Sequence, residues 1–121
     1  MKFLFVLLIG VLLVAGCTQS GGNNPPPGNQ TGNVVRISGF AFIPQTITIK
    51  KGETVTWTNE DSVPHQIASD PHPTHTDLPG LLSPALQNGQ SYTFTSDKVG
   101  TWGYHCHLHP TMKGTAIVTE G

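Results

Sequence analysis

Residues 100–118 read GTWGYHCHLHPTMKGTAIV. Apolar residues that alternate with polar ones predict two strands, near 101–106 and 114–119, joined by a turn at Leu108 to Pro110. Between Tyr104 and Met112 lie three of the chain's six histidines, a cysteine and one of its two methionines. Sulfur donors and imidazoles at this density predict a transition-metal site at the end of a strand.

The spacing of these donors predicts which of them share a metal. Cys106, His109 and Met112 follow the pattern C-x-x-H-x-x-M, so one tight loop can bring three ligands to a single point. If Cys106 faces inward on its strand, His105 points to the opposite face, and His107 begins that way. We therefore expect His105 and His107 to lie away from the metal that Cys106 binds.

The remaining ligand must come from elsewhere in the chain. His65 follows the predicted strand TVTWTN (residues 54–59) and begins the next one, whereas His72 and His75 lie in the proline-rich loop SDPHPTHTD (residues 69–77). A strand holds a ligand more rigidly than a loop does, so we expect His65 to complete the site.

His72 and His75 allow two interpretations. Flanked by Asp70 and Asp77, they could bind a second metal at the surface. A solvated loop is the simpler interpretation, because the prolines shape the loop without any metal.

The alternation of apolar and polar residues begins at Val34 and continues to the end of the chain. It predicts strands near 34–40, 45–50, 54–59, 65–69, 91–95, 101–106 and 114–119. Short strands at this spacing predict an all-β, antiparallel sandwich. The formal net charge of −1 gives no basic excess that would indicate nucleic acid as a partner.

The first 33 residues are predicted to lie outside this domain, which spans residues 34–121. MKFLFVLLIGVLLVAGC has the features of a leader, namely Lys2, an apolar run and small residues before Cys17. LVAGC resembles the lipobox of bacterial lipoproteins, which predicts a signal peptide at 1–16 and a lipid on Cys17. A transmembrane anchor is the alternative, but Phe3 to Ala15 is short for a span of about 20 residues.

Residues 18–33 are rich in Gly, Asn and Pro, which predicts a flexible linker.

The leader places the domain outside the cytoplasm, in the cell envelope, with the lipid as its membrane anchor. If Cys17 carries a lipid, Cys106 is the only remaining thiol, so the chain has no internal disulfide. Metal ligation explains a lone thiol in an oxidising compartment, because a coordinated thiolate is protected.

Two segments together resemble the small blue-copper proteins, the cupredoxins. They are TVTWTNEDSVPHQI (residues 54–67) and GTWGYHCHLHPTMKGTAIV, and the C-x-x-H-x-x-M spacing is that of amicyanin rather than plastocyanin. The resemblance implies a Greek-key β-sandwich of about seven to eight strands. It also implies one copper ion that alternates between Cu(I) and Cu(II) and has four ligands: His65, Cys106, His109 and Met112.

Further residues acquire roles from the same resemblance. The backbone N–H of Gln66 is expected to donate a hydrogen bond to the cysteine sulfur, although many members have Asn at this position. Leu108 replaces a proline that often precedes the second histidine. The exposed edge of His109, with Leu108 and Pro110 around it, is expected to pass electrons to redox protein partners in small, transient contacts. We expect no catalytic residue and no small-molecule substrate.

Two other functions remain as alternatives. One is an extracytoplasmic protein that binds or delivers copper without transferring electrons. The other is the electron-entry module of a copper oxidase or nitrite reductase, because the HCH sequence also occurs in multicopper oxidases. Six histidines are too few for the additional cluster of those enzymes, so oxygen consumption or nitrite reduction by the purified protein would be needed to support this alternative.

Overall fold

The computed structural model describes residues 33–121, so the predicted leader, Cys17 and linker lie outside the described residues. The described part contains eight strands and no helix. The strands are β1 (Val34–Ser38), β2 (Ala41–Ile43), β3 (Thr46–Lys50), β4 (Thr54–Asn59), β5 (Ile67–Ser69), β6 (Ser91–Thr95), β7 (Gly100–Cys106) and β8 (His109–Thr119). The all-β prediction is confirmed. Within these residues, no helix is long and apolar enough to cross a membrane.

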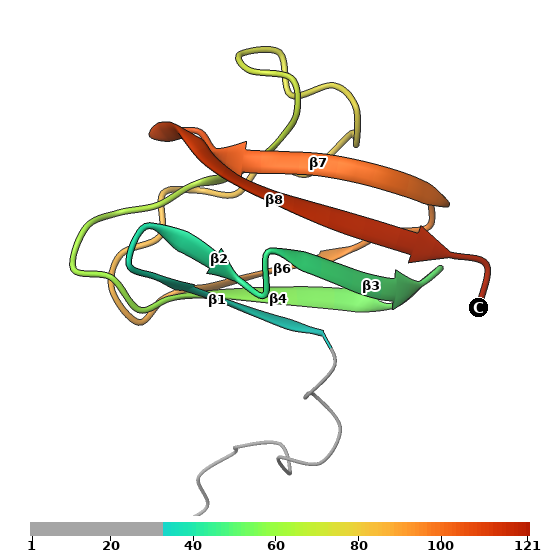
Figure 1. Cartoon of the computed structure of the whole chain (residues 1–121), viewed down its shortest axis with the longest axis horizontal. Coiled ribbons are helices and arrows are strands. Elements are labelled where there is room, and N and C mark those ends of the chain that lie inside the picture. Colours follow the sequence, from blue (N-terminus) through green and yellow to red (C-terminus); the bar gives the residue numbers. More distant parts are fainter. Residues whose placement is uncertain (1–32) are drawn as a thin grey trace, which may run out of the picture.

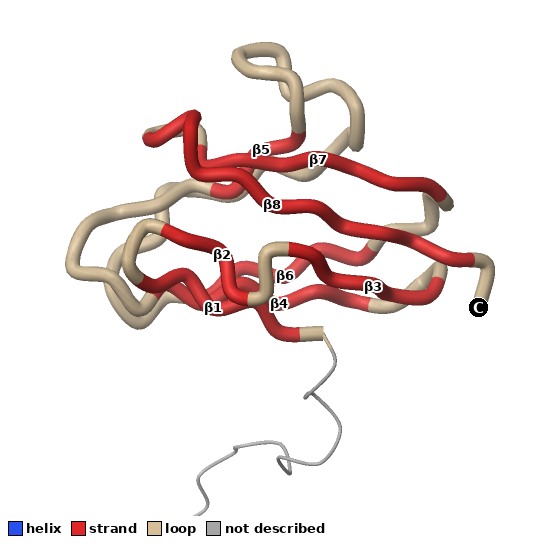
Figure 2. The backbone as a smooth tube through the Cα atoms, in the orientation of Figure 1, coloured by secondary structure: helices blue, strands red, loops and turns tan. Residues whose placement is uncertain are grey.

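The strands form two four-stranded sheets, ordered β2-β1-β4-β6 and β3-β8-β7-β5, which pack face to face (Figures 1 and 2). Alternate residues of β1, β3 and β4 are buried between the sheets, as the period of two predicted. The predicted sandwich is present, but it is antiparallel only in part, because β1 pairs with β4 and β3 pairs with β8 in parallel. Alternation reports which face of a strand is buried and carries no information about the direction of its neighbour.

The first predicted strand ends early, at a turn that leads into an additional strand. The strand predicted at 34–40 ends at Ser38, and Gly39 and Phe40 form a turn with positive φ angles of 61° and 58°. The unpredicted β2 follows this turn and pairs back on β1. The Asp61 carboxylate accepts hydrogen bonds from the backbone N–H groups of Gly39 and Phe40, at 2.7 and 3.0 Å, which stabilises the turn.

The β7–β8 hairpin also turns earlier than predicted. The turn consists of His107 and Leu108 alone, and β8 already begins at His109, which pairs with Cys106. An irregularity in the pairing between His105 and Cys106 accompanies this tight turn. The hairpin therefore places the end of β7 and the start of β8 directly beside each other.

Tyr104 fixes the register of this hairpin. Its ring is fully buried and makes edge contacts with Phe42 and Trp57, at centroid distances of 4.8 and 5.5 Å. Its partner across the strands is Gly114, where any Cβ would overlap the Tyr104 ring. Burial raises the pKa of the Tyr104 hydroxyl to about 12, so the ring stays neutral in the core.

We expect Gly114→Ala to lower the free energy of unfolding by about 1–3 kcal/mol, because the added methyl group overpacks a site that has no room for it. Lys113→Ala, at an exposed neighbour on β8, should change stability by no more than about 0.5 kcal/mol. Chemical denaturation of the metal-free proteins measures both. Equal stability of the two variants would show that Gly114 does not set the packing of Tyr104.

Candidate metal centre

Cys106 is the centre of a buried cluster of donor atoms. It ends β7, is fully buried, and is the one cysteine among the described residues. Its Sγ lies 3.5 Å from Nδ1 of His65 and 3.5 Å from Nδ1 of His109. All three donor atoms lie within 4.8 Å of one another, close enough for one metal ion to bind them together.

Met112 comes from the same hairpin as two of these donors. It lies on β8, three residues after His109, and is 6% exposed. Because β8 begins at His109, one continuous strand carries both residues. A buried thioether is the kind of weak donor that copper accepts beside imidazoles and a thiolate.

His65 does not begin a strand, contrary to the prediction, because β5 starts only at Ile67. It forms an isolated bridge with Leu86, in which each backbone N–H donates to the other's carbonyl, at 3.1 and 2.7 Å. The fully buried Asn59 donates to the carbonyls of Val63 and Leu86 at 2.9 and 2.8 Å. Since buried polar groups need such partners, Asn59 and the bridge together restrain the backbone of His65.

Asp61 orients the His65 ring and was not predicted. The Nε2–H of His65 donates to the Asp61 carboxylate at 2.8 Å, which leaves Nδ1 unprotonated and directed at Cys106. Desolvation opposes ionisation of Asp61, but hydrogen bonds from Phe40, His65 and Gly39 hold its pKa below the usual range. The four-residue spacing of Asp61 and His65 is the one signal in the sequence that could have indicated this pair.

Gln66 makes the contact that the family resemblance implied. Its backbone N–H donates to Cys106 Sγ at 3.4 Å, and its carbonyl accepts a hydrogen bond from His107 N–H at 2.8 Å. Its side chain donates to the carbonyl of Ser83 at 2.9 Å. The donor to sulfur therefore belongs to a backbone segment that is anchored on both sides.

An apolar surface lies over the two imidazoles. Phe40 packs its ring edge-to-face with His65 and His109, at centroid distances of 5.3 and 5.2 Å, and is itself 53% exposed. Leu108 is 43% exposed, and Pro110 is exposed beside it. His65 is fully buried, whereas His109 is half-buried, so His109 is the imidazole that reaches this surface.

His105 and His107 lie apart from the Cys106 cluster and join His72 and His75 in a second group of donors. His105 is nevertheless 1% exposed, because the segment between β5 and β6, which rises above β7 in Figure 1, covers this outer face. Desolvation and the charges of the other three histidines hold the pKa of His72 below its ordinary value.

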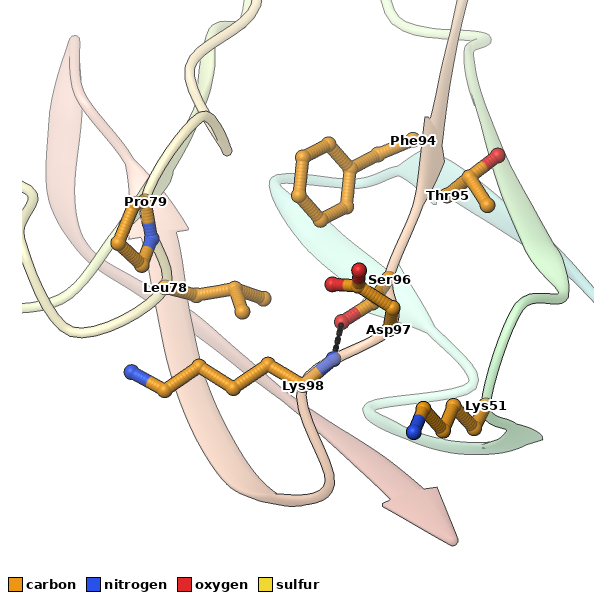
Figure 3. A pocket seen from close by; sticks show the side chains of 8 residues that line it. All are labelled: Lys51, Leu78, Pro79, Phe94, Thr95, Ser96, Asp97 and Lys98. Atoms are coloured by element: carbon orange, nitrogen blue, oxygen red, sulfur yellow. Dashed lines mark hydrogen bonds between the residues drawn. The ribbon is translucent and has the colours of Figure 1, made fainter. Parts of the chain in front are cut away.

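A separate hollow of about 480 Å³ lies at the opposite end of β7 from Cys106. Figure 3 shows its lining, which combines apolar Leu78 and Phe94 with polar residues of the β6–β7 loop, where Lys98 N–H donates to Ser96 Oγ at 3.3 Å. It contains no histidine or cysteine, so it has no part in the metal centre.

The donor set fits one type 1 copper ion. Two imidazoles, a thiolate and a thioether suit a soft or borderline metal, and they exclude magnesium and calcium, which require oxygen ligands. Structural zinc sites use more thiolates and seldom a thioether. The chemistry of His65, Cys106, His109 and Met112 is therefore consistent with one copper ion, and the donor atoms of the first three already lie together.

Comparisons with known proteins identify copper-binding relatives. Residues 30–119 match the family described as copper binding proteins, plastocyanin/azurin family. The chain is 41% identical over 85 residues to a plastocyanin from Scenedesmus fuscus, which covers 65% of this chain and 87% of that one. It is 35% identical over 85 residues to amicyanin-alpha from Methylorubrum extorquens, with 69% of each chain covered.

Solved structures give the same result at the level of the fold. A copper(I) form of an amicyanin variant superposes with a TM-score of 0.64 and 31% identity, covering 72% of this chain and 81% of that one. A purple cupredoxin from Nitrosopumilus maritimus superposes with a TM-score of 0.63 and 28% identity, covering 72% and 99%. With its sandwich, its cluster of copper donors and these relatives, the chain belongs to the plastocyanin/azurin family of copper-binding proteins.

Proposed function

We propose that this protein is a blue copper one-electron carrier in which His65 Nδ1, Cys106 Sγ, His109 Nδ1 and the Met112 sulfur bind a single copper ion. The observation that carries the proposal is the buried Cys106 Sγ at 3.5 Å from each of two imidazole nitrogens. Membership of the plastocyanin/azurin family supports it further. Copper in this environment alternates between Cu(I) and Cu(II), which is the chemistry that electron transfer needs.

The protein's part is to hold the donors in place before an electron arrives. Asp61 keeps the proton of His65 on Nε2, so Nδ1 keeps its lone pair for the metal. The Gln66 N–H stabilises negative charge on Cys106 Sγ. Packing of the buried donors against the core leaves them little freedom to move, so little reorganisation accompanies a change in charge.

We propose that electrons enter and leave at the surface formed by Phe40, Leu108, His109 and Pro110. His109 is half-buried and connects this surface with Cys106 Sγ. Exposed apolar side chains around a donor favour contacts that are small and readily reversed, which suits transient redox protein partners. We therefore describe the partners only as redox proteins that present an apolar surface to this one.

We also propose that the domain works outside the cytoplasm, attached to a membrane through a lipid on Cys17. The support lies in the leader, in the LVAGC sequence and in the polar linker at 18–33. The linker would let the domain reorient towards its partners.

The alternatives have less support. Copper delivery requires ready exchange of the ion, but both Cys106 and His65 are fully buried. The second alternative is an enzyme. Membership of the plastocyanin/azurin family supports a carrier instead, so we propose that the protein is not an enzyme. Oxygen consumption or nitrite reduction by the purified protein would argue against this.

Adding Cu(II) to the metal-free protein should give an intense blue thiolate charge-transfer band that a reductant bleaches reversibly. Cys106→Ala should abolish the band, since it removes the thiolate. Thr111→Ala, at an exposed position between two ligands, should keep it. Absorption spectra through repeated redox cycles measure this. A colourless wild-type protein, or colour in the Cys106→Ala variant, would refute the proposed site, and copper transfer to an acceptor apoprotein would favour delivery.

Leu108→Asp should slow electron self-exchange between the Cu(I) and Cu(II) forms by about 10-fold, because it places like charges opposite each other when two molecules meet. Val99 is exposed to a similar degree, 41% against 43%, but precedes β7 at the end far from Cys106. Val99→Asp should therefore leave the rate nearly unchanged. NMR line broadening in mixtures of the two redox forms measures the rate, and equal effects of both variants would contradict the proposed surface.

Cys17→Ser should prevent lipid attachment. We expect the variant to leave the membrane fraction once its leader has been cleaved. Cys106→Ser, which removes the other cysteine, should stay with the membrane. Fractionation and mass spectrometry of the N-terminus distinguish the outcomes. A cleaved Cys17→Ser protein that remains in the membrane fraction would rule out the lipid anchor.

A further inference from the structure

Four imidazoles converge on the outer face of β7, away from the blue copper site. His105 and His107 flank Cys106, while His72 and His75 come from the loop that follows β5. Nδ1 of His72 lies 3.2 Å from Nε2 of His105, and Nε2 of His75 lies 2.9 Å from Nδ1 of His107. One nitrogen from each ring lies within 4.8 Å of the other three.

We propose that His72, His75, His105 and His107 bind a second metal ion, a divalent first-row transition ion of the zinc or copper class. Imidazole nitrogen is a borderline ligand that suits these ions, whereas calcium and magnesium require oxygen. Thiolate is absent from the group, so it differs in kind from the blue copper site. The loop after β5 supplies two of the four donors, and the β7–β8 hairpin supplies the other two, one from β7 and one from the turn.

The dimensions of the cluster fit such an ion. A tetrahedral ion bound at about 2.0–2.1 Å from each nitrogen separates the nitrogens by roughly 3.3 Å. The two closest pairs already lie at 3.2 and 2.9 Å, and the widest separation is within 4.8 Å. Small rotations of His72, which is exposed, and His75, which is half-buried, would close the group around the ion.

Hydrogen bonds on the outer nitrogens orient two of the rings for metal binding. Nδ1–H of His105 donates to the Asp70 carboxylate at 2.7 Å, and Nδ1–H of His75 donates to the carbonyl of Ser69 at 2.8 Å. In each case the bond fixes the tautomer in which Nε2 offers a lone pair to the centre of the group. Ligating histidines in proteins are regularly held by carboxylates or carbonyls in this way.

The fold makes room for this orientation. Asp70 N–H donates to the carbonyl of Gly103 at 3.0 Å, which holds the start of the loop against β7. A Cβ at Gly103 would collide with the Asp70 carboxylate, so glycine at this position lets the carboxylate reach His105. The proposed site is also open to solvent through His72, which gives an ion a way in.

The experiment counts metal ions bound to the full-length protein. Protein loaded with one equivalent of copper is incubated with Zn²⁺, or in a parallel sample with further Cu²⁺, and is passed through a desalting column for elemental analysis. The expected result is two ions per chain in total. The further Cu²⁺ should give an EPR signal with hyperfine coupling to several nitrogens, without a second blue band.

Variants at the loop test the assignment. His72→Ala combined with His75→Ala should lower the affinity for the second ion at least ~100-fold while the blue band remains. Thr74→Ala combined with Thr76→Ala alters exposed positions of the same loop and should retain two ions. Asp70→Asn should weaken binding about 10–100-fold, because it loosens His105 without removing a ligand.

Two results would overturn the proposal. One is a wild-type protein that holds a single ion under both conditions, and the other is a His72→Ala, His75→Ala variant that binds two ions as the wild type does. Zinc is counted independently of the blue colour. Failure of the blue copper proposal and failure of the second site are therefore distinguishable.

Discussion

The pleat of β7 is the constraint on which the rest of this structure depends. Successive side chains of a strand point to opposite faces, so Cys106 lies in the core between the sheets while His105 lies on the outer face. The turn that follows has only two residues, and it brings His109 back beside Cys106. The β7–β8 hairpin thereby supplies Cys106 and His109 to the copper donors, and His105 and His107 to the proposed second site.

Both groups of histidines are held by the same physical device. A carboxylate accepts the outer N–H of a buried imidazole, Asp61 for His65 and Asp70 for His105, at 2.8 and 2.7 Å. The Asp61 carboxylate also accepts a hydrogen bond from the Gly39 N–H, and the backbone N–H of Asp70 donates to the carbonyl of Gly103. Such pairs fix the tautomer and restrict rotation of the ring, which prepares a site for its metal.

Gln66 connects the two groups through the backbone. Its N–H donates to Cys106 Sγ, and its carbonyl accepts a hydrogen bond from His107 N–H. Of the two imidazoles beside Cys106, His65 is fully buried and His109 is half-buried, with its ring against the exposed Phe40. The proposed electron-transfer surface at His109 is therefore separate from the buried thiolate, which suits a carrier that meets its partners briefly.

The sequence by itself determined the fold class and the grouping of Cys106, His109 and Met112, because both depend on local spacing. Alternation is visible in single strands, and C-x-x-H-x-x-M places its donors within one hairpin. Tertiary structure decided what depends on residues far apart: the parallel pairings, the isolated bridge that holds His65, and the Asp61 and Asp70 contacts. It also decided that His72 and His75 meet His105 and His107. Those contacts arise only when a loop folds over a strand some thirty residues later, and no local pattern in the sequence encodes that approach.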